Sequence, residues 1–463
     1  MELFSRRNLA AAIAICLAAP TASYATNGYF LIGFGAKSRG MGGAGVAYGT
    51  DALAAAANPA TMMDVKMNTM RIDVGGEFFS PPRAMRHDSA TLGVTSEKSG
   101  SNVFLIPNMG GIYKFNRKMV VGMAVVGAGF NTRYNQLPPS NPTCVNGNTS
   151  GGTDSYFYNF NCNADSPTVG MQLMQMQMLP SAAYKINKHH TVGASLAFAV
   201  QTFRAYGFGA FQDLGFAAST DHVSGEGNDW SYGGGIRLGY LGTFAKKKLK
   251  VGVNYSSRVY MTKFDKYRNL FAEQGDFDIP ENYAIGIAYK FSKKLTVAGD
   301  IQRIKYSDVK SVSNPGPNVV DLTDLNPLCP GLDTPECLLG GNLGMGMGWT
   351  DMTVYKLGFN YDYNKKWSFR AGVNYGKAPI PKDQILFNFV APATTEKHIT
   401  LGASYRPSPN TEWTVNYQHA FKNTIEGPTA YPPAANAGQS VIGANAAISM
   451  YINSVGLSFS YKM

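Results

Sequence analysis

Residues 230–261 read WSYGGGIRLGYLGTFAKKKLKVGVNYSSRVYM, and the alternation in this stretch sets the fold of the whole chain. Between 230 and 244 the even positions carry most of the large apolar side chains, and the odd positions carry mainly glycine and polar residues. A short basic turn at 246–248 leads into a second alternating run at 249–261. In that run the residues expected on the apolar face are Leu249, Val251, Val253, Tyr255, Val259 and Met261. A period of two is typical of strands with one apolar face, so the stretch predicts an antiparallel hairpin.

The same pattern recurs over residues 67–463, with short basic turns alternating with longer polar loops. Alternating segments lie near 67–80, 102–116, 119–134, 173–186, 191–206, 229–244, 248–262, 280–291, 294–308, 349–363, 366–377, 394–406, 411–426 and 447–463. Fourteen is an even number, which places both ends of a closed barrel on the same side of a membrane. The basic turns then share one end, assigned to the periplasm. The long loops share the other end and are 81–101, 135–172, 207–228, 263–279, 309–348, 378–393 and 427–446.

Composition and an export signal separate a membrane barrel from a soluble sandwich. Only 15% of the residues are charged, whereas about a quarter is usual for soluble proteins. Residues 1–25 combine Arg6 and Arg7, a short apolar run and small residues before Ala25, as in a cleaved signal peptide. No segment offers about 18 consecutive apolar residues for a transmembrane helix. Residues 67–463 are therefore predicted to form an all-β, 14-stranded antiparallel transmembrane β-barrel in the bacterial outer membrane.

Residues 26–66, TNGYFLIGFGAKSRGMGGAGVAYGTDALAAAANPATMMDVK, hold too few bulky side chains to close a core of their own. We predict that this segment, here called the hatch, folds as a plug inside the lumen of the barrel. Gly40, Gly42 and Gly45 form a G-x-G-x-x-G, but the βαβ unit that a dinucleotide site needs does not follow. No nucleotide or other cofactor is predicted.

Four stretches resemble the FadL-type family, the outer-membrane transporters of long-chain fatty acids and aromatic hydrocarbons. They are NGYFLIGFGAKSRGMGGAGVA (27–47), DALAAAANPA (51–60), FDKYRNLFAEQGDFDIPENY (264–283) and IQRIKYSDVKSVSNPG (301–316). The resemblance implies a 14-stranded barrel, an N-terminal hatch and passive uptake of hydrophobic molecules.

The resemblance also implies where a gate would lie. It places the motif Asn58-Pro59-Ala60 against an inward kink of the third strand, beside a lateral gap in the wall. The third segment here contains Gly127 and Gly129, and glycine within a strand indicates a bulge or a close approach of another backbone. These five residues form the predicted gate, through which an apolar ligand would pass sideways into lipid.

Three groups of side chains are candidates for ligand binding. Met174, Met176 and Met178 share one face of the run MQLMQMQM, and methionine adapts to ligands of varied shape. The alternative is a lipid-facing strand. Tyr267, Leu270 and Phe271 would form an apolar stripe on a short loop helix, or else a lid packed on its neighbours. Arg237 and Arg258 are expected inside the barrel. There one arginine could hold a carboxylate by a bidentate pair, or the luminal charges could neutralise one another.

The remaining cysteines, histidines and lysines indicate no catalytic, metal or nucleic-acid site. Cys144 and Cys162 lie in one polar loop and Cys329 and Cys337 in another, which predicts one disulfide within each loop. Neither pair has metal-binding spacing. The net charge of +11 lies in the turns rather than on one nucleic-acid-binding patch. There is no G-x-S-x-G or H-E-x-x-H, and a hydrolase that uses Ser257 and His419 is a further alternative.

The sequence thus predicts a monomeric, non-enzymatic transporter that contacts its hydrophobic substrate, outer-membrane lipid and the barrel assembly machinery. The route would consist of capture by the extracellular loops, passage beside the plug and lateral exit near the third strand. The alternative is a general diffusion porin or a structural surface barrel. Planar-bilayer conductance would distinguish the porin from the plugged transporter, because only an open porin gives large steady ion currents.

Overall fold

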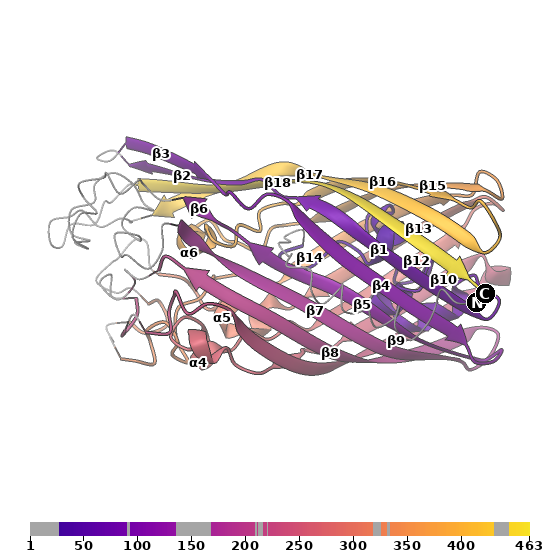
Figure 1. Cartoon of the computed structure of the whole chain (residues 1–463), viewed down its shortest axis with the longest axis horizontal. Coiled ribbons are helices and arrows are strands. Elements are labelled where there is room, and N and C mark those ends of the chain that lie inside the picture. Colours follow the sequence, from indigo (N-terminus) through magenta and orange to yellow (C-terminus); the bar gives the residue numbers. More distant parts are fainter. Residues whose placement is uncertain are drawn as a thin grey trace.

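Fourteen antiparallel strands hydrogen-bond side by side and close into a barrel (Figure 1). The computed structural model describes residues 27–89, 93–135, 168–208, 211, 216–219, 221–317, 326–330, 334–429 and 444–463. The predicted signal peptide, 1–25, lies outside these residues. The ring consists of β1 (Met70–Ser80), β4 (Phe104–Lys114), β5 (Met119–Asn131), β7 (Thr168–Lys185), β8 (His190–Tyr206), β9 (Asp229–Phe244), β10 (Leu249–Ser256), β12 (Asn282–Lys290), β13 (Leu295–Ile304), β14 (Met352–Tyr361), β15 (Trp367–Gly376), β16 (Lys397–Tyr405), β17 (Thr411–Thr429) and β18 (Ala444–Lys462). Pairing of β1 with β18 closes the ring, and the predicted fold is confirmed.

The predicted loop 81–101 is wrong as a loop, because most of it forms a hairpin of β2 (Arg83–Ser89) and β3 (Gly93–Lys98). β18 extends beyond the rim of the ring, where β1 no longer pairs with it. There β2 takes over as its partner, with Met450 opposite Arg83. A strand edge of this length exposes unpaired backbone groups, and the hairpin satisfies them. Two shorter strands, β6 (Tyr134–Asn135) and β11 (Tyr260–Met261), add to the sheet beside β7 and β9.

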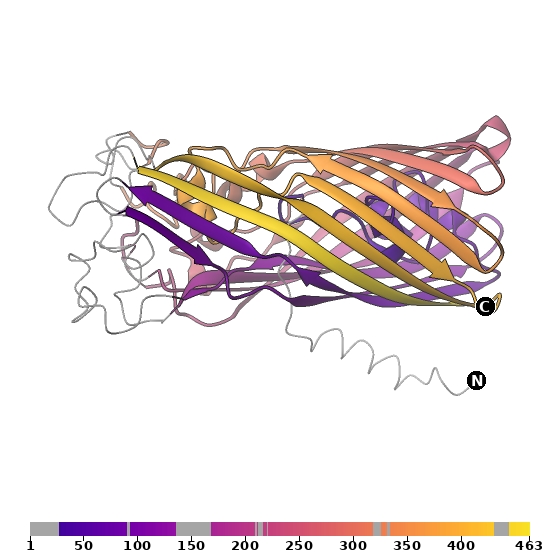
Figure 2. The same ribbon diagram turned by 90° about the horizontal axis from the view of Figure 1, so that it is seen from above.

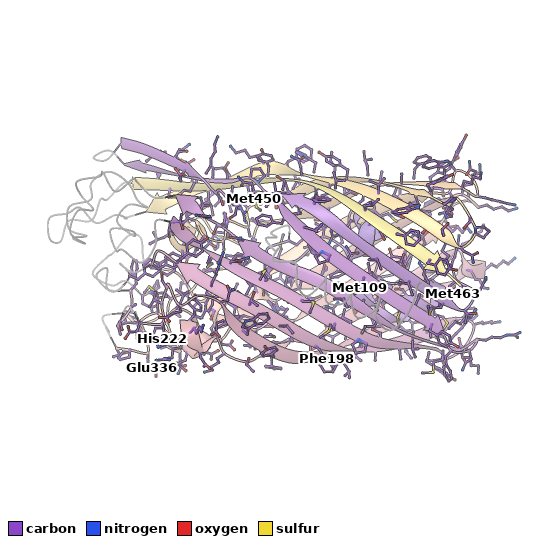
Figure 3. All side chains as sticks on the ribbon, viewed as in Figure 1. Met109, Phe198, His222, Glu336, Met450 and Met463 are labelled. Atoms are coloured by element: carbon purple, nitrogen blue, oxygen red, sulfur yellow. A yellow bond between two sulfur atoms is a disulfide. The ribbon has the colours of Figure 1, made fainter. Side chains whose placement is uncertain are left out.

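The wall turns its apolar face outward, as the alternation predicts. In β9, Trp230, Tyr232 and Leu238 are exposed, whereas Ser231 and Arg237 are buried. Figure 3 shows side chains projecting from the outside of the wall, among them Phe198.

The alternation predicts the wrong face for the end of the following segment. Val259 and Met261 are buried, while Tyr260 is 68% exposed. The pairing register with β9 shifts by one residue between Ser256 and Tyr260, and a shift of one residue turns every following side chain to the other face.

The hatch lies inside the ring of strands, coloured indigo in Figures 1 and 2. It contains α2 (Gly35–Arg39), α3 (Ala54–Ala57) and the 3-10 turn η1 (Pro59–Asp64). Its backbone rests on glycines of the wall: a Cβ at Gly252 would lie 2.0 Å from the carbonyl oxygen of Val46. Asp300 in the wall accepts hydrogen bonds from the backbone N–H groups of Gly45 and Val46, at 2.8 and 3.1 Å. Buried ion pairs, Lys37 with Glu412 and Arg39 with Glu77, add further contacts.

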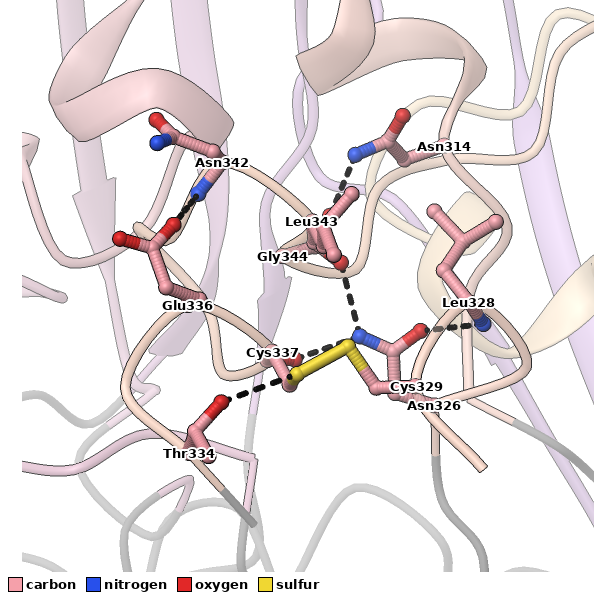
Figure 4. The surroundings of a disulfide bond; sticks show 10 residues. All are labelled: Asn314, Asn326, Leu328, Cys329, Thr334, Glu336, Cys337, Asn342, Leu343 and Gly344. Carbon is pink, nitrogen blue, oxygen red and sulfur yellow. Dashed lines mark hydrogen bonds between the residues drawn. A yellow bond between two sulfur atoms is a disulfide. The ribbon is translucent and has the colours of Figure 1, made fainter. Parts of the chain in front are cut away.

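The described parts of the long loops lie at the end of the barrel opposite the short turns (Figure 1). They carry η7 (Asp265–Tyr267), α4 (Ala272–Gly275), η8 (Tyr306–Asp308), α5 (Lys310–Ser313) and α6 (Ile385–Asn388), while η6 (Ala245–Lys247) lies in a basic turn at the other end. The predicted disulfide between Cys329 and Cys337 is present (Figure 4). Cys144 and Cys162 lie outside the described residues. None of the helices that the structure describes is long and apolar enough to cross a membrane.

Candidate functional site

An apolar pocket lies among the loops at the end of the barrel opposite the short turns. Its cavity volume is about 50 Å³. The lining residues come from β7, from the long loops and from α6, and are Met171, Phe208, Phe211, Leu270, Phe271, Ser311, Leu339, Met345, Gly346, Met347, Phe387, Phe389 and Val390. Ser311 supplies the only polar side chain in this lining. The composition suits an apolar group, but the cavity is smaller than the roughly 300–1,000 Å³ of typical ligand sites, so a whole ligand fits only if the surrounding loops part.

Aromatic rings fix the walls of this pocket. Phe211 stacks on Phe387 with the ring centroids 5.6 Å apart, and Phe208 stacks on Phe211 at 4.9 Å. Phe271 packs on Phe203 of β8 at 4.6 Å. Such pairs stabilise by about 0.5–1.5 kcal/mol beyond the area they bury, so they help to fix the lining of the pocket.

Two of the three residues predicted as an apolar loop stripe line the pocket, namely Leu270 and Phe271. Tyr267 does not. Its ring is buried against Phe203, its hydroxyl donates to the carbonyl oxygen of Gly227 at 2.5 Å, and burial raises the pKa of that hydroxyl to about 12. Tyr267 therefore packs as part of a lid. The expected loop helix is wrong as well, since only single turns form around these residues.

Arg258 is engaged by neighbouring acids at the loop end of the wall. Its Nε donates to Asp278 at 2.5 Å, one Nη donates to Asp276 at 3.3 Å, and the other donates to the backbone oxygen of Asp308 at 2.6 Å. The alternative in which luminal charges neutralise one another thus describes Arg258. All three nitrogens of its guanidinium already donate hydrogen bonds to protein oxygens, so no bidentate edge is left for a ligand.

This acid cluster gives the loop a dependence on pH. Burial and then the neighbouring Asp278 raise the pKa of the Asp276 carboxyl from 3.8 to about 6, against the opposing charge of Arg258. The folded loop therefore binds the proton more tightly than the unfolded chain does. That contribution to stability is full below pH 3.8 and is lost as the pH rises through about 6.

We expect proteolysis within 263–281 to accelerate as the pH rises from about 4 to about 6. Asp276→Asn should flatten the profile and Asp265→Asn should preserve it; a profile that survives Asp276→Asn contradicts the assignment.

A second cavity lies between the hatch and the third strand of the ring, β5. It is lined by Phe30, Leu31, Phe34, Val126, Gly127, Ala128, Gln175, Gln177 and Arg237. Arg237 is buried and forms no ion pair with any described acid. It donates to the backbone oxygen of Ala56 and, at 2.7 Å, to the side-chain oxygen of Gln177, and its guanidinium lies 5.9 Å from the ring centre of Phe34. The lining of this cavity thus combines two phenylalanine rings with one cation.

The hydrogen-bond ladder of the wall is interrupted beside this cavity. β4 and β5 are paired from Lys114, which lies opposite Val120, to Met109, which lies opposite Val125. The pairing ends there. Beyond that point β4 continues to pair with β1, and β5 continues to pair with β7. The two backbones therefore diverge over 104–108 and 126–131.

Gly129 lies in the diverging part of β5 with a φ of +146°. A Cβ at this position would lie 2.1 Å from the carbonyl oxygen of Leu173. Only glycine fits such a backbone, which is the close approach that the sequence predicts here. Gly127 borders the cavity but has no tight contact of this kind.

The motif Asn58-Pro59-Ala60 contacts the neighbouring strands β8 and β9 of the wall. The side-chain amide of Asn58 donates to the carbonyl oxygens of Tyr240 in β9 and Val46, at 3.0 and 2.7 Å. A Cβ at Gly193 in β8 would lie 2.5 Å from the backbone nitrogen of Ala60. Small residues on β8 and β9 thus make room for the motif. The kink of β5 borders the ring of Phe34 and its neighbours.

Met174, Met176 and Met178 lie half-buried on the outer face of β7, where the intervening Gln175 and Gln177 point inward. The lipid-facing alternative describes this placement, although Met174 also packs against the buried core. Sequence reasoning missed Phe208, Phe211, Phe387 and Phe389, because loop residues follow no period. The signal present was the density of phenylalanine in otherwise polar loops.

No catalytic or metal site emerges from the described residues. The Ser257 hydroxyl donates to the backbone oxygen of Arg258 and accepts from the backbone of Ile236. His419 contacts Asn453 at 2.9 Å. Within the ranges that the structure describes, no group of three His, Cys, Asp or Glu residues could hold a metal ion.

Comparison with known proteins gives a family match and several structural likenesses. Residues 18–461 match the family model described as outer membrane protein transport protein (OMPP1/FadL/TodX). The Pseudomonas putida toluene transporter TodX superposes with a TM-score of 0.62 at 17% identity, over 95% of this chain and 100% of that one. The Ralstonia pickettii toluene transporter TbuX gives 0.59 at 17%, over 94% and 99%. A Pseudomonas aeruginosa FadL homologue gives 0.62 at 13%, over 94% and 99%. At these identities the likeness shows the fold alone.

One curated relative matches over a short part of its length. An uncharacterized protein from the phosphoenolpyruvate carboxykinase gene 5′ region of Chlorobium limicola is 36% identical over 91 residues. The match covers 19% of this chain and 45% of the relative. The chain therefore spans less than half the length of that protein.

Proposed function

The chain belongs to the OMPP1/FadL/TodX family of outer-membrane transporters of hydrophobic compounds, and from this premise we propose a route for passive uptake through its barrel. The apolar loop pocket carries the proposal, because it is an apolar cavity among the loops at the end away from the short turns. A ligand that enters it exchanges water for phenylalanine and methionine side chains, which favours binding by about 25 cal/mol per Å² of apolar surface buried.

The lower part of the route runs beside the hatch. The cavity lined by Phe34, Val126 and Gly127 lies between hatch and wall, next to the interrupted pairing of β4 and β5. A ligand that leaves there enters the apolar part of the bilayer and avoids the polar end of the lumen. The hatch fills the bore and contacts inward-facing glycines, which argues against the general diffusion porin.

Long-chain fatty acids and aromatic hydrocarbons are the two proposed substrate classes. The toluene transporters TodX and TbuX support the second class by likeness of fold. Arg237 supports the first class, since its guanidinium lies in the cavity without an acidic partner among the described residues. An arginine in this position can accept a carboxylate as a charge-assisted pair.

Binding of labelled oleate and labelled toluene to the purified protein tests the proposal. We expect saturable binding of at least one of the two and electrically silent planar bilayers. If Arg237 recognises a carboxylate, Arg237→Gln should weaken oleate binding and leave toluene binding unchanged. Failure of both ligands to bind contradicts capture, and large steady currents contradict the plugged barrel.

The lateral exit predicts a specific effect at Gly129. An alanine there must move away from the carbonyl oxygen of Leu173, and such backbone strain costs about 1–3 kcal/mol. We expect Gly129→Ala to lower oleate or toluene uptake by whole cells about tenfold while binding to the purified protein persists. Gly111→Ala is the matched control, because a Cβ at Gly111 meets nothing within 4 Å. Equal uptake by both variants would rule out this exit.

A further inference from the structure

The end of the barrel that carries the short turns opens into a strongly basic cavity, here called the basic mouth. Its volume is about 490 Å³, and it lies beneath the hatch. Ten lysines and four arginines line it, against the carboxylates of Asp64, Asp362 and Glu412. The excess of positive charge in this one cavity is therefore as large as the net charge of the whole chain, +11. Cations from several turns and strands therefore converge on one cavity.

The strands deliver these cations to inward-facing positions. In β4 the buried inward face runs through Asn108 and Ile112, and Lys114 is its next inward position. Lys185 continues the inward face of β7, and Lys290 that of β12, in the same way. All three line the basic mouth.

Other basic turns at this end serve as a contrast. Lys293, Lys294, Lys365 and Lys366 occupy the turns after β12 and β14, and none of them lines the cavity. Solubility alone would be served by lysines in the turns. Inward placement in addition points to something that the cavity holds.

The acids of the cavity are already occupied. Glu412 pairs with Lys37, Arg71, Arg406 and Lys462. Asp64 pairs with Lys250 at 2.7 Å, and Asp362 accepts hydrogen bonds from Ser368 and Asn360.

Several cations of the cavity have no such partner. No acid of the described chain forms a salt bridge with Lys114, Arg117, Lys185, Lys188, Lys248 or Lys290. A concave site lined by one sign of charge focuses its field and concentrates counter-ions.

We propose that the basic mouth binds a multivalent phosphate-bearing anion of small-molecule size. A large excess of positive charge suits an anion that carries several negative charges, and a phosphate group can meet lysine as a point charge and arginine through its planar fork. A cavity of about 490 Å³ admits a small anion or a lipid headgroup but not the face of a folded protein. Because hatch residues Tyr48 and Thr50 also line it, a bound anion would bridge hatch and wall.

Titration with inorganic tripolyphosphate tests this site. The full-length mature protein is placed in nanodiscs of zwitterionic lipid, and binding is followed by calorimetry at low and at high salt. We expect saturable binding that weakens with salt, since the site is open to water. The triple variant Lys185→Glu, Lys248→Glu and Lys290→Glu should weaken binding at least about tenfold, as removal of charge-assisted contacts predicts.

The matched control makes the same change in net charge at the same end of the barrel. Lys293→Glu, Lys294→Glu and Lys366→Glu alter turn lysines that do not line the cavity, and binding should stay within about twofold of the parent protein. Equal loss in both sets would show only a diffuse counter-ion cloud and would overturn the proposal. Glutamine versions of the cavity set keep the test valid if the charge reversals do not fold.

A second arm separates the two sources of phosphate. Nanodiscs that contain anionic phospholipid are analysed by native mass spectrometry for lipid retained on the protein. Retention that the cavity set loses and the turn set keeps assigns a lipid headgroup as occupant, whereas tripolyphosphate binding without lipid retention assigns a soluble compound. Absence of both overturns the site, and neither readout depends on uptake of hydrophobic substrate.

Discussion

Valine at Gly372 and Gly252 is expected to drive the hatch out of the lumen and turn an electrically silent barrel into an open channel. A Cβ at Gly372 would lie 2.2 Å from the backbone nitrogen of Gly42, and one at Gly252 would lie 2.0 Å from the carbonyl oxygen of Val46. Backbone atoms cannot yield as a flexible side chain can, and overpacking costs about 1–3 kcal/mol at each site. The strand ladders do not depend on the hatch, so the wall should persist.

Planar-bilayer recording measures this effect directly. The heat-modifiable change in electrophoretic mobility on SDS gels checks that the barrel has closed. Gly111→Val is the control, because its Cβ has open space around it on β4. Silent membranes with the double variant would mean that the hatch is seated by contacts other than these glycines, for example by its ion pairs with Glu77 and Glu412.

The second large effect is expected at the loop pocket. Leu270→Asp places a carboxylate beside Phe271 and Phe387 in a cavity whose lining is almost wholly apolar. A ligand would have to strip water from that charge without offering a partner, which costs several kcal/mol. A loss of about 2.7 kcal/mol already lowers affinity about 100-fold.

Equilibrium binding of labelled oleate or toluene to the purified variant checks this expectation. Leu343→Asp is the matched control, since Leu343 lies in a neighbouring loop, is 44% exposed and does not line the pocket. Because Leu270 is only half-buried, the variant should fold. Unchanged affinity in Leu270→Asp would show that capture happens elsewhere.

The wall of the barrel could be predicted because its signal is local. The alternation within each segment indicates which residues face lipid and which face the lumen. Basic residues mark the short connections. The same locality explains why 81–101 was predicted as a loop. Its own sequence does not indicate that the long edge of β18 pairs with β2. Likewise, the one-residue register shift before Tyr260 that buries Val259 and Met261 leaves no mark on the alternation.

The candidate site was predicted only in part, for the same reason. Leu270 and Phe271 were found from a short apolar stripe, but their partners Phe211 and Phe387 come from other loops, and only the closed barrel brings those loops together. The gate motif shows the same limit, because its neighbour is decided by which inward glycines leave room.

By itself the sequence determined the number of strands, the direction of their apolar faces, the small-residue hatch and the end that carries the basic turns. These depend on side chains a few residues apart along one segment. The tertiary structure alone decided that Asn58 meets β9, that β4 and β5 part beyond Met109, and that scattered lysines converge on one cavity. The physical reason is that closure of the ring fixes contacts between segments hundreds of residues apart, which no local period encodes.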